Sequence, residues 1–202
     1  MRKLALLILA LATILSLNAW ADSTISFTNI GGTLTGTSSG LVLTGSTLVA
    51  VNGFGGLGLI TGNNLGTVEF STGALTSGSL DQGGTFAAGG TFTITGNGSN
   101  GLPNGVIFSG SFSGPVTWTL VTLADGTHNY TLYGAVVGTL SGGSSANGAT
   151  LQLTINTGKG FFNGSTEISS GDTNIVVPEP GTLGLLGSGL LGLAGLVRHK
   201  KR

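Results

Sequence analysis

The middle of this chain consists of short runs in which large apolar residues alternate with small polar ones. Four of these runs are TFTITG at 91–96, PVTWTLVTL at 115–123, YTLYGAVVGTL at 130–140 and LQLTINTG at 151–158. In the second run Val116, Trp118 and Leu120 fall on one side of an extended chain, and the intervening threonines fall on the other. A period of two with many β-branched residues predicts half-buried β-strands.

Asn-Gly and Asp-Gly pairs separate these runs and supply the positive φ that tight turns need. They are Asn52-Gly53, Asn97-Gly98, Asn100-Gly101, Asn104-Gly105, Asp125-Gly126, Asn147-Gly148 and Asn163-Gly164. No stretch between residues 22 and 177 has helical periodicity. We therefore predict an all-β domain over 22–177, with about eight to twelve strands in an antiparallel β-sandwich or a related barrel.

A β-solenoid is the alternative fold, because Gly-, Thr- and Asn-rich chains often stack short strands into a helix. Solenoids show a fixed internal repeat. The turn pairs here are unevenly spaced and have no common period, which favours the sandwich or barrel.

The first 21 residues have the pattern of a secretory signal peptide. Arg2 and Lys3 precede an apolar run from Leu4 to Leu17, and Ala19-Trp20-Ala21 forms a small-x-small cleavage site. The run is shorter than the roughly 20 residues that a membrane span needs. We predict a signal helix that signal peptidase removes after Ala21, with recognition through Ala19 and Ala21; an uncleaved helix is the alternative.

The last residues have the pattern of a membrane anchor. Residues 182–197 carry no charge and would extend about 24 Å as a helix. The basic residues after them can extend toward the headgroups and act as a stop that stays on the cytoplasmic side. These basic residues are Arg198, Lys200, Lys201 and Arg202, and we call them the basic cluster. We predict a transmembrane helix over 182–197 with its C-terminus inside and the domain outside.

Val177-Pro178-Glu179-Pro180, a Gly- and Leu-rich apolar run and a terminal basic cluster together resemble the PEP-CTERM sorting signal of bacterial exported proteins. This signal is also described as the C-terminal domain of ice-binding proteins. The resemblance implies that exosortase, a membrane-embedded cysteine protease, recognises Pro178, Glu179 and Pro180. It further implies cleavage at or near this motif and delivery to the cell surface or an extracellular polymer.

The chemistry of the motif agrees with this implication. Pro178 and Pro180 fix φ and withhold backbone donors, so the segment should remain extended and accessible to a protease. Glu179 should stay outside the membrane. A plain C-terminal anchor with an incidental Pro-Glu-Pro would give the same topology without cleavage, and it remains the alternative.

The charge of the domain excludes one class of partner. Residues 22–177 contain six acids against Lys159, a net charge of −5, and such a domain should not bind nucleic acid. The acids are Asp22, Glu69, Asp81, Asp125, Glu167 and Asp172. The chain has no cysteine, which excludes disulfides and thiolate catalysis.

Three patterns that often mark an active site are better explained in other ways. Gly53-x-Gly55-x-x-Gly58 has the spacing of a dinucleotide-binding turn, but no helix is predicted after it. His128 follows the Asp125-Gly126 turn, and we interpret it as a turn residue because no nucleophile is marked out beside it. One histidine and no cysteine cannot form an ordinary zinc site.

Sugar-related chemistry is harder to exclude. Glycoside hydrolysis needs two carboxylates at a suitable separation, and nothing in the sequence brings two of the acids together. Five aromatic residues could stack on sugars, but aromatic residues at strand positions predict core. They are Trp118, Tyr130, Tyr133, Phe161 and Phe162. Rows at Thr91, Thr93 and Thr95 and at Thr117 and Thr119 resemble pieces of an ice-binding face, without a repeat to extend them.

Two functions therefore remain. The first is a non-enzymatic cell-surface or extracellular-matrix protein without a cofactor, whose partners are signal peptidase, an exosortase-type protease, the membrane and extracellular polysaccharide. The second is a secreted carbohydrate-binding or carbohydrate-active domain. Two acids and an aromatic residue in one cleft would favour the second function. A smooth Thr, Ser and Asn surface with scattered acids would favour the first.

Overall fold

The computed structural model describes residues 23–177 of the chain, and Thr24–Val177 form one compact unit. The predicted signal helix at 1–21 and transmembrane helix at 182–197 lie outside the described residues, as do Ala19, Ala21, the Pro178–Pro180 motif and the basic cluster. Within residues 23–177 the structure has no helix that is long and apolar enough to cross a membrane.

The described residues form thirteen strands in one antiparallel sheet, slightly more than the sequence predicts. The strands are β1 Ser23–Ile30, β2 Thr33–Thr37, β3 Gly40–Asn52, β4 Ile60–Ser71, β5 Leu75–Ser79, β6 Gly83–Phe86, β7 Gly89–Asn97, β8 Asn104–Phe112, β9 Val116–Thr122, β10 His128–Leu140, β11 Ser145–Asn156, β12 Ser165–Glu167 and β13 Ser170–Val177. The four alternating runs of the sequence fall in β7, β9, β10 and β11. The predicted all-β antiparallel fold is confirmed.

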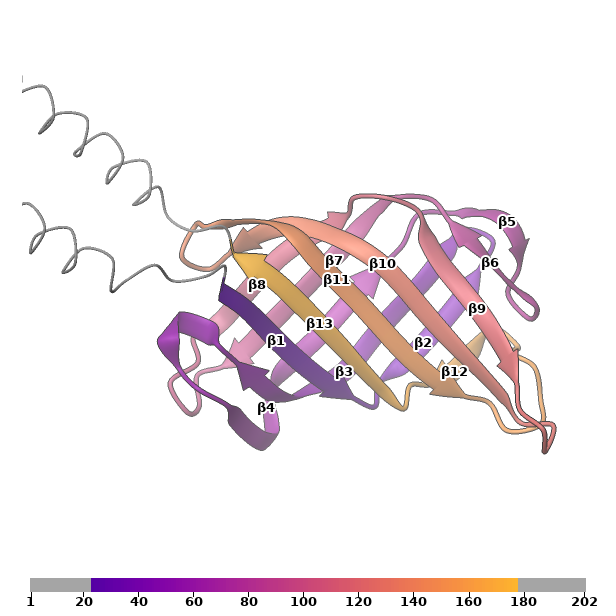
Figure 1. Ribbon diagram of the computed structural model, residues 1–202, viewed down its shortest axis with the longest axis horizontal. Helices are drawn as coiled ribbons and strands as arrows, with labels where there is room; N and C mark the ends of the chain where they lie inside the picture. Colours follow the sequence, from indigo (N-terminus) through magenta and orange to yellow (C-terminus); the bar gives the residue numbers. More distant parts are fainter. Residues whose placement is uncertain (1–22, 178–202) are drawn as a thin grey trace, which may run out of the picture. The chain divides into compact units, whose positions relative to one another are not determined.

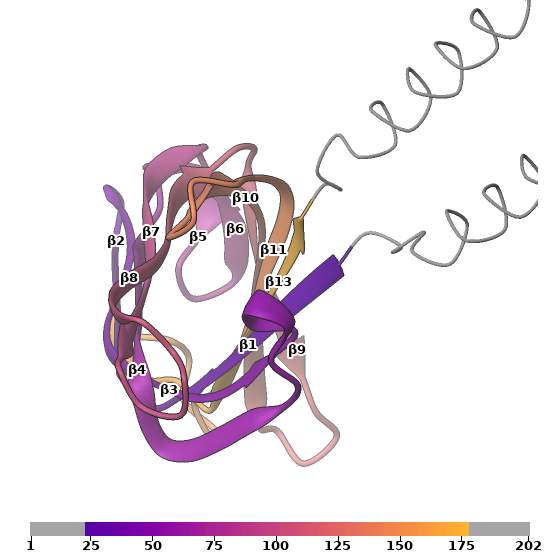
Figure 2. The same ribbon diagram turned by 90° about the vertical axis from the view of Figure 1, so that its left-hand side faces the viewer.

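Eight strands close the sheet on itself. Their order is β11, β13, β1, β3, β4, β7, β8 and β10, and β10 pairs with β11 to complete the ring. Figure 2 shows β3, β4, β7 and β8 on one side of the core, with β1, β10, β11 and β13 on the other. This continuous, closed sheet is the arrangement of a barrel. Its strands pair antiparallel and differ in length, so they do not form the regular repeat of a solenoid.

The strand β10 changes its neighbour along its length. Residues 128–133 pair with β9, and residues 136–140 pair with β8. Gly134 lies between these two segments, and a side chain there would collide with the ring of Phe112. On the side of β9 the sheet continues from β9 to β6 and then to β5. A second branch starts at β3, which pairs with β2, and β2 in turn pairs with β12.

We define the proximal end of the sheet as the end where β1 begins and β13 ends, and the distal end as the opposite one. At the proximal end Ser26 of β1 pairs with Asn52, and its hydroxyl donates to Asn174 Oδ1 at 2.7 Å. The loops 53–59, 98–103 and 141–144 lie at this end. The β9–β10 turn at Leu123–Thr127 lies at the distal end (Figure 1).

Most of the predicted turns are confirmed. Gly53, Gly98, Gly101 and Gly126 all have positive φ, and the Asp125-Gly126 turn closes with Leu123 N–H donating to Thr127 O at 2.8 Å. Asn104-Gly105 and Asn147-Gly148 are different, since they lie inside β8 and β11. The turn prediction was wrong at both pairs. Asn104 and Gly105 pair with Asn97 and Gly96 of β7, and Asn147-Gly148 lies at a shift in register between Ala146 and Ala149, which both pair with β10.

The core is one continuous cluster inside the ring. Phe70, Phe92, Phe108 and Phe112 pack in stacked and edge-to-face pairs in its middle. Asn29, Ser46 and Thr173 are polar residues that are fully buried. The Asn29 amide donates to Ser46 Oγ at 2.7 Å, while Asn29 Oδ1 and Thr173 Oγ1 have no partner in the described structure. Alternation along the strands places most apolar side chains inside and most hydroxyl side chains outside.

Candidate functional site

Three of the five candidate aromatic residues form the distal part of the core. Trp118 stacks on Tyr130 with ring centroids 4.8 Å apart, and Phe162 meets Trp118 edge to face. Trp118 is 1% exposed, and Tyr130 and Phe162 are also buried. The core interpretation is confirmed for these three residues, and none of them is available to a sugar.

Hydrogen bonds fix this aromatic cluster to the loops above it. Trp118 Nε1–H donates to Leu80 O at 2.8 Å. The Tyr130 hydroxyl donates to Asp81 O at 2.6 Å and accepts from the Phe162 N–H at 3.0 Å. Each polar group of the two rings is therefore satisfied, as burial requires. The cluster acts as a plug that holds the 80–82 and 157–164 loops over the distal end.

For Tyr133 and Phe161 the core interpretation was wrong. Tyr133 is 51% exposed, because the alternation that buries Tyr130 and Leu132 turns the next residue outward. Phe161 is also half exposed, and one face of its ring covers His128 at a centroid distance of 4.2 Å.

His128 is not the turn residue that the sequence suggests. It is the first residue of β10 and is nearly buried. Its Nδ1 lies 3.0 Å from Thr122 Oγ1, and its backbone N–H donates to Gly158 O at 2.7 Å. The contacts therefore assign His128 to packing between the β9–β10 hairpin and the 157–164 loop.

Asp125 is engaged by its own turn. Its Oδ1 accepts from the Thr127 N–H at 2.9 Å. This backbone hydrogen bond, and then a bond from the Thr127 side chain, lower the pKa of the exposed Asp125 carboxyl. The carboxylate thus forms an Asx turn, and the side-chain partner of His128 is Thr122 rather than Asp125.

The remaining acids lie on separate elements. Asp81 occupies the β5–β6 turn, where the Ser79 and Gln82 side chains lower the pKa of its carboxyl. Glu69 faces outward from β4, and Glu167 lies on β12. Asp172 faces outward from β13 and accepts from Thr28 Oγ1 at 2.8 Å. Among the described residues no group of three His, Asp or Glu could hold a metal ion.

The dinucleotide-like glycine spacing at 53–58 is a surface loop. It contains a 3-10 turn at Phe54–Gly56 and leads into the strand β4. A pyrophosphate would need the N-terminus of a following helix, and the element that follows is a strand.

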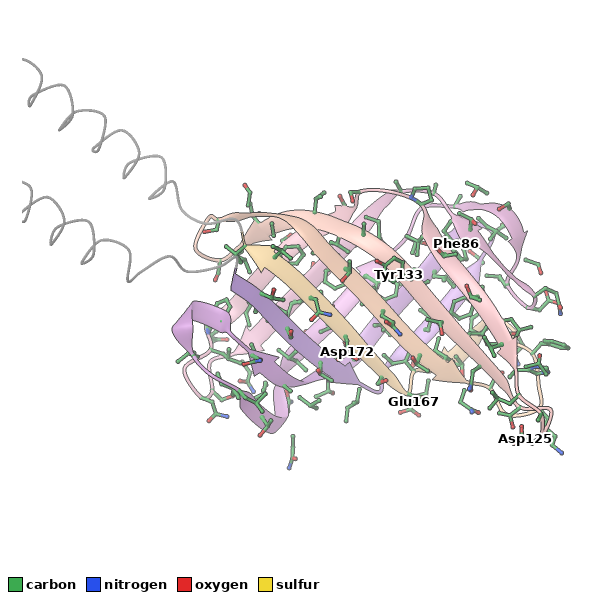
Figure 3. The ribbon with its side chains drawn as sticks, viewed as in Figure 1. Phe86, Asp125, Tyr133, Glu167 and Asp172 are labelled. Atoms are coloured by element: carbon green, nitrogen blue, oxygen red, sulfur yellow. The ribbon has the colours of Figure 1, made fainter. Side chains whose placement is uncertain are left out.

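A row of polar side chains crosses the outer face of five neighbouring strands, and we call it the Tyr133 row. Tyr133 pairs with Thr117 on one side and with Gln152 on the other. Gln152 pairs with Asp172, which binds Thr28 on β1. The row therefore consists of Thr117, Tyr133, Gln152, Asp172 and Thr28, and Figure 3 shows Tyr133 and Asp172 on one face of the sheet.

A second polar row lies on the other half of the sheet. Thr91, Thr93 and Thr95 alternate with buried Phe92 and Ile94 on β7. Thr93 pairs with Glu69 of β4 and Ser109 of β8, and Ser71 Oγ lies 3.0 Å from Thr91 Oγ1. The threonine row of β7 thus continues sideways onto β4 and β8 through other polar side chains. Sequence reasoning looked for their continuation along the chain and missed these partners.

The predicted sorting motif begins where the described body ends. Val176 and Val177 complete β13, and Pro178 is the next residue. β13 is held between β1 and β11, so Val177, the residue before the motif, lies at the proximal end.

Comparisons with known proteins bear on this same segment. The family model of the PEP-CTERM protein-sorting motif matches residues 176–201, which include Pro178–Pro180 and the basic residues Arg198, Lys200 and Lys201. Neither the curated proteins nor the solved structures contain a match to the chain. The chain therefore carries a PEP-CTERM protein-sorting motif at residues 176–201.

Proposed function

We propose that this chain is an exported bacterial protein of the cell surface or extracellular matrix. In this proposal signal peptidase removes residues 1–21, the apolar run 182–197 anchors the chain, and an exosortase-type protease processes it at Pro178–Pro180. The observation that supports it most is the match of the sorting-motif family to residues 176–201. The body at 22–177 is then the cargo that the tail delivers.

We further propose that the body is not an enzyme. In support of this, the acids lie on separate elements, and three of them have local partners: Asp81 in its turn, Asp125 with Thr127, and Asp172 with Thr28. Its histidine packs against Phe161. An outer surface of threonine, serine and amide side chains around scattered acids suits a passive or adhesive domain.

The second candidate function is polysaccharide binding by the body, and one observation favours it. The exposed Tyr133 ring is flanked on adjacent strands by Thr117 and Gln152. An aromatic face with hydroxyl and amide groups beside it offers stacking together with hydrogen bonds, which is what a sugar ring requires.

Fractionation of the native host tests the sorting proposal. Replacing Pro178, Glu179 and Pro180 with Ala should leave a full-length, membrane-bound protein, whereas the wild type should lose its tail. Neutralising Arg198, Lys200, Lys201 and Arg202 should weaken retention, because each charge opposes entry into the bilayer by about 2.5–3.5 kcal/mol. If the wild type keeps Arg202 and stays in the membrane, the tail is an anchor and processing is excluded.

A glycan array probed with the exported protein tests the second candidate. Tyr133→Ala should abolish any specific signal. Val106→Ala is the matched control, since Val106 is also 51% exposed but lies on β8, outside the Tyr133 row. Equal signals from both variants would exclude the Tyr133 row as the binding surface.

A further inference from the structure

The loop between β3 and β4 has an unusual composition for a surface segment. From Gly53 to Ile60 its sequence is GFGGLGLI, without a single polar side chain. Leu59 is 69% exposed, the highest value among the large apolar side chains of the described residues, and Leu57 is 36% exposed. Two leucines on a glycine loop expose apolar surface that folding alone does not require.

The local geometry keeps these leucines outside. The Gly53 N–H donates to Leu57 O at 3.2 Å, and the Leu57 N–H donates to Phe54 O at 2.9 Å. Gly53, Gly55 and Gly56 all have positive φ, which glycine adopts most readily. Phe54 packs against the core. The loop is therefore a compact turn that Phe54 fastens to the body. Leu57 lies beside Gly101 of the 98–103 loop and stays partly exposed, and Leu59 is the more exposed of the two leucines.

The loop lies at the end of the body from which the C-terminal tail leaves. Gly53 lies against the backbone carbonyl of Thr24, near the start of β1. Asn52, directly before the loop, pairs with Ser26, and Ser26 bonds Asn174 near the end of β13. Figure 1 shows the β3–β4 loop beside the start of β1 and the end of β13.

Only a short segment separates this end from the apolar run. Residues 178–181 connect Val177 to Thr182, and four extended residues span at most about 14 Å. The three loops at the proximal end, 53–59, 98–103 and 141–144, contain no charged residue. Three charged loop residues, Asp81, Asp125 and Lys159, belong to the distal end.

We propose that Leu57 and Leu59 insert into the lipid surface of the membrane that holds the tail. This inference rests on the proposed anchoring of residues 182–197. A short tether keeps the proximal end within reach of the bilayer, and the uncharged loops remove the desolvation cost that would oppose contact. The loop thus acts as a second, weak contact that orients the body on the membrane while the protein awaits processing.

The absence of cysteine allows a direct test with the full chain. Single variants Leu59→Cys, Leu123→Cys and Ser188→Cys are labelled with nitrobenzoxadiazole and reconstituted in phosphatidylcholine vesicles. Leu123 is the matched control, because it is a 42% exposed leucine in a distal loop. Ser188 lies in the middle of the apolar run and reports the tail itself.

We expect the probes at 188 and 59 to shift to shorter emission wavelengths and to be quenched by spin-labelled lipids. The probe at 188 should be quenched most from deep in the bilayer, and the probe at 59 from near the headgroups. The probe at 123 should keep the emission it has in water.

The outcomes separate the two proposals. If the probe at 188 is in the bilayer and the probe at 59 emits as in water, the tail is anchored and the proposed lipid contact of the loop is wrong. If the probe at 188 also emits as in water, the anchoring proposal is wrong, and the inference about the loop is wrong as well because it rests on that anchoring. Equal quenching at 59 and 123 would show that the body adsorbs without orientation, which also overturns the inference.

Discussion

The two ends of the closed sheet differ in how their loops are held and in the charge that the loops carry. At the distal end Trp118, Tyr130 and Phe162 fill the interior and are hydrogen-bonded to the loops above them. At the proximal end the loops are uncharged; Leu102 is buried there, whereas Leu59 of the 53–59 loop is 69% exposed. Both ends bury some large apolar side chains and expose others, as Leu123 and Phe161 show at the distal end, but of these loops only the distal ones also carry charged residues. The difference indicates that the distal end stabilises the fold and the proximal end is available for contact with something else.

Truncation of Trp118 in the plug should cause the largest loss in the free energy of unfolding. We expect Trp118→Ala to lower the free energy of unfolding by about 3–5 kcal/mol, because it removes a buried ring and leaves a cavity beside Tyr130. Urea denaturation followed by circular dichroism measures the change. Val121→Ala on the same strand is the control, since Val121 is exposed. A loss below about 1 kcal/mol would mean that the distal cluster does not stabilise the body.

Removal of a single oxygen from the plug should have an intermediate effect. Tyr130→Phe leaves Asp81 O and the Phe162 N–H without their partner, so we expect a loss of about 1–3 kcal/mol. Tyr133→Phe is a close control, because that hydroxyl lies on the outer face three residues further along the same strand. Equal midpoints for the two variants would show that the loops over the distal end are held by packing alone.

The smallest effect on stability is expected at the proximal end. Replacing Leu57 and Leu59 with Ser should change the free energy of unfolding by no more than about 0.5 kcal/mol each, because neither leucine belongs to the core. The same denaturation experiment gives the value. A loss comparable to that of Trp118→Ala would break the comparison, since the leucines would then be part of the folding core.

Local patterns in the sequence predict the strands but not their neighbours. The alternation in TFTITG and PVTWTLVTL is sufficient to assign β7 and β9, and the Asp125-Gly126 pair is sufficient to place the turn before β10. The pairing of β1 with β13 is different, because it joins residues that are 148 positions apart. Nothing local in either strand specifies the other, so ring closure could not be predicted.

The errors at His128 and Tyr133 have a common cause. In HNYTLY the period of two already places His128, Tyr130 and Leu132 on one side and Tyr133 on the other. The prediction assigned all five aromatic residues to the core and His128 to a turn. It did not apply the period of two to each residue separately. The Tyr133 row itself required the register of β9, β10, β11 and β13, which depends on long-range contacts.

The position of β13 in the ring also sets an order of events for a chain that crosses a membrane from its N-terminus. Until the last strand emerges, β1 and β11 each present an unpaired edge, which is a site for wrong pairing and aggregation. The ring becomes complete only when Val177 is available, and the next residue is Pro178. If the chain is exported and processed as proposed, the sorting motif therefore emerges only after every strand of the ring is available.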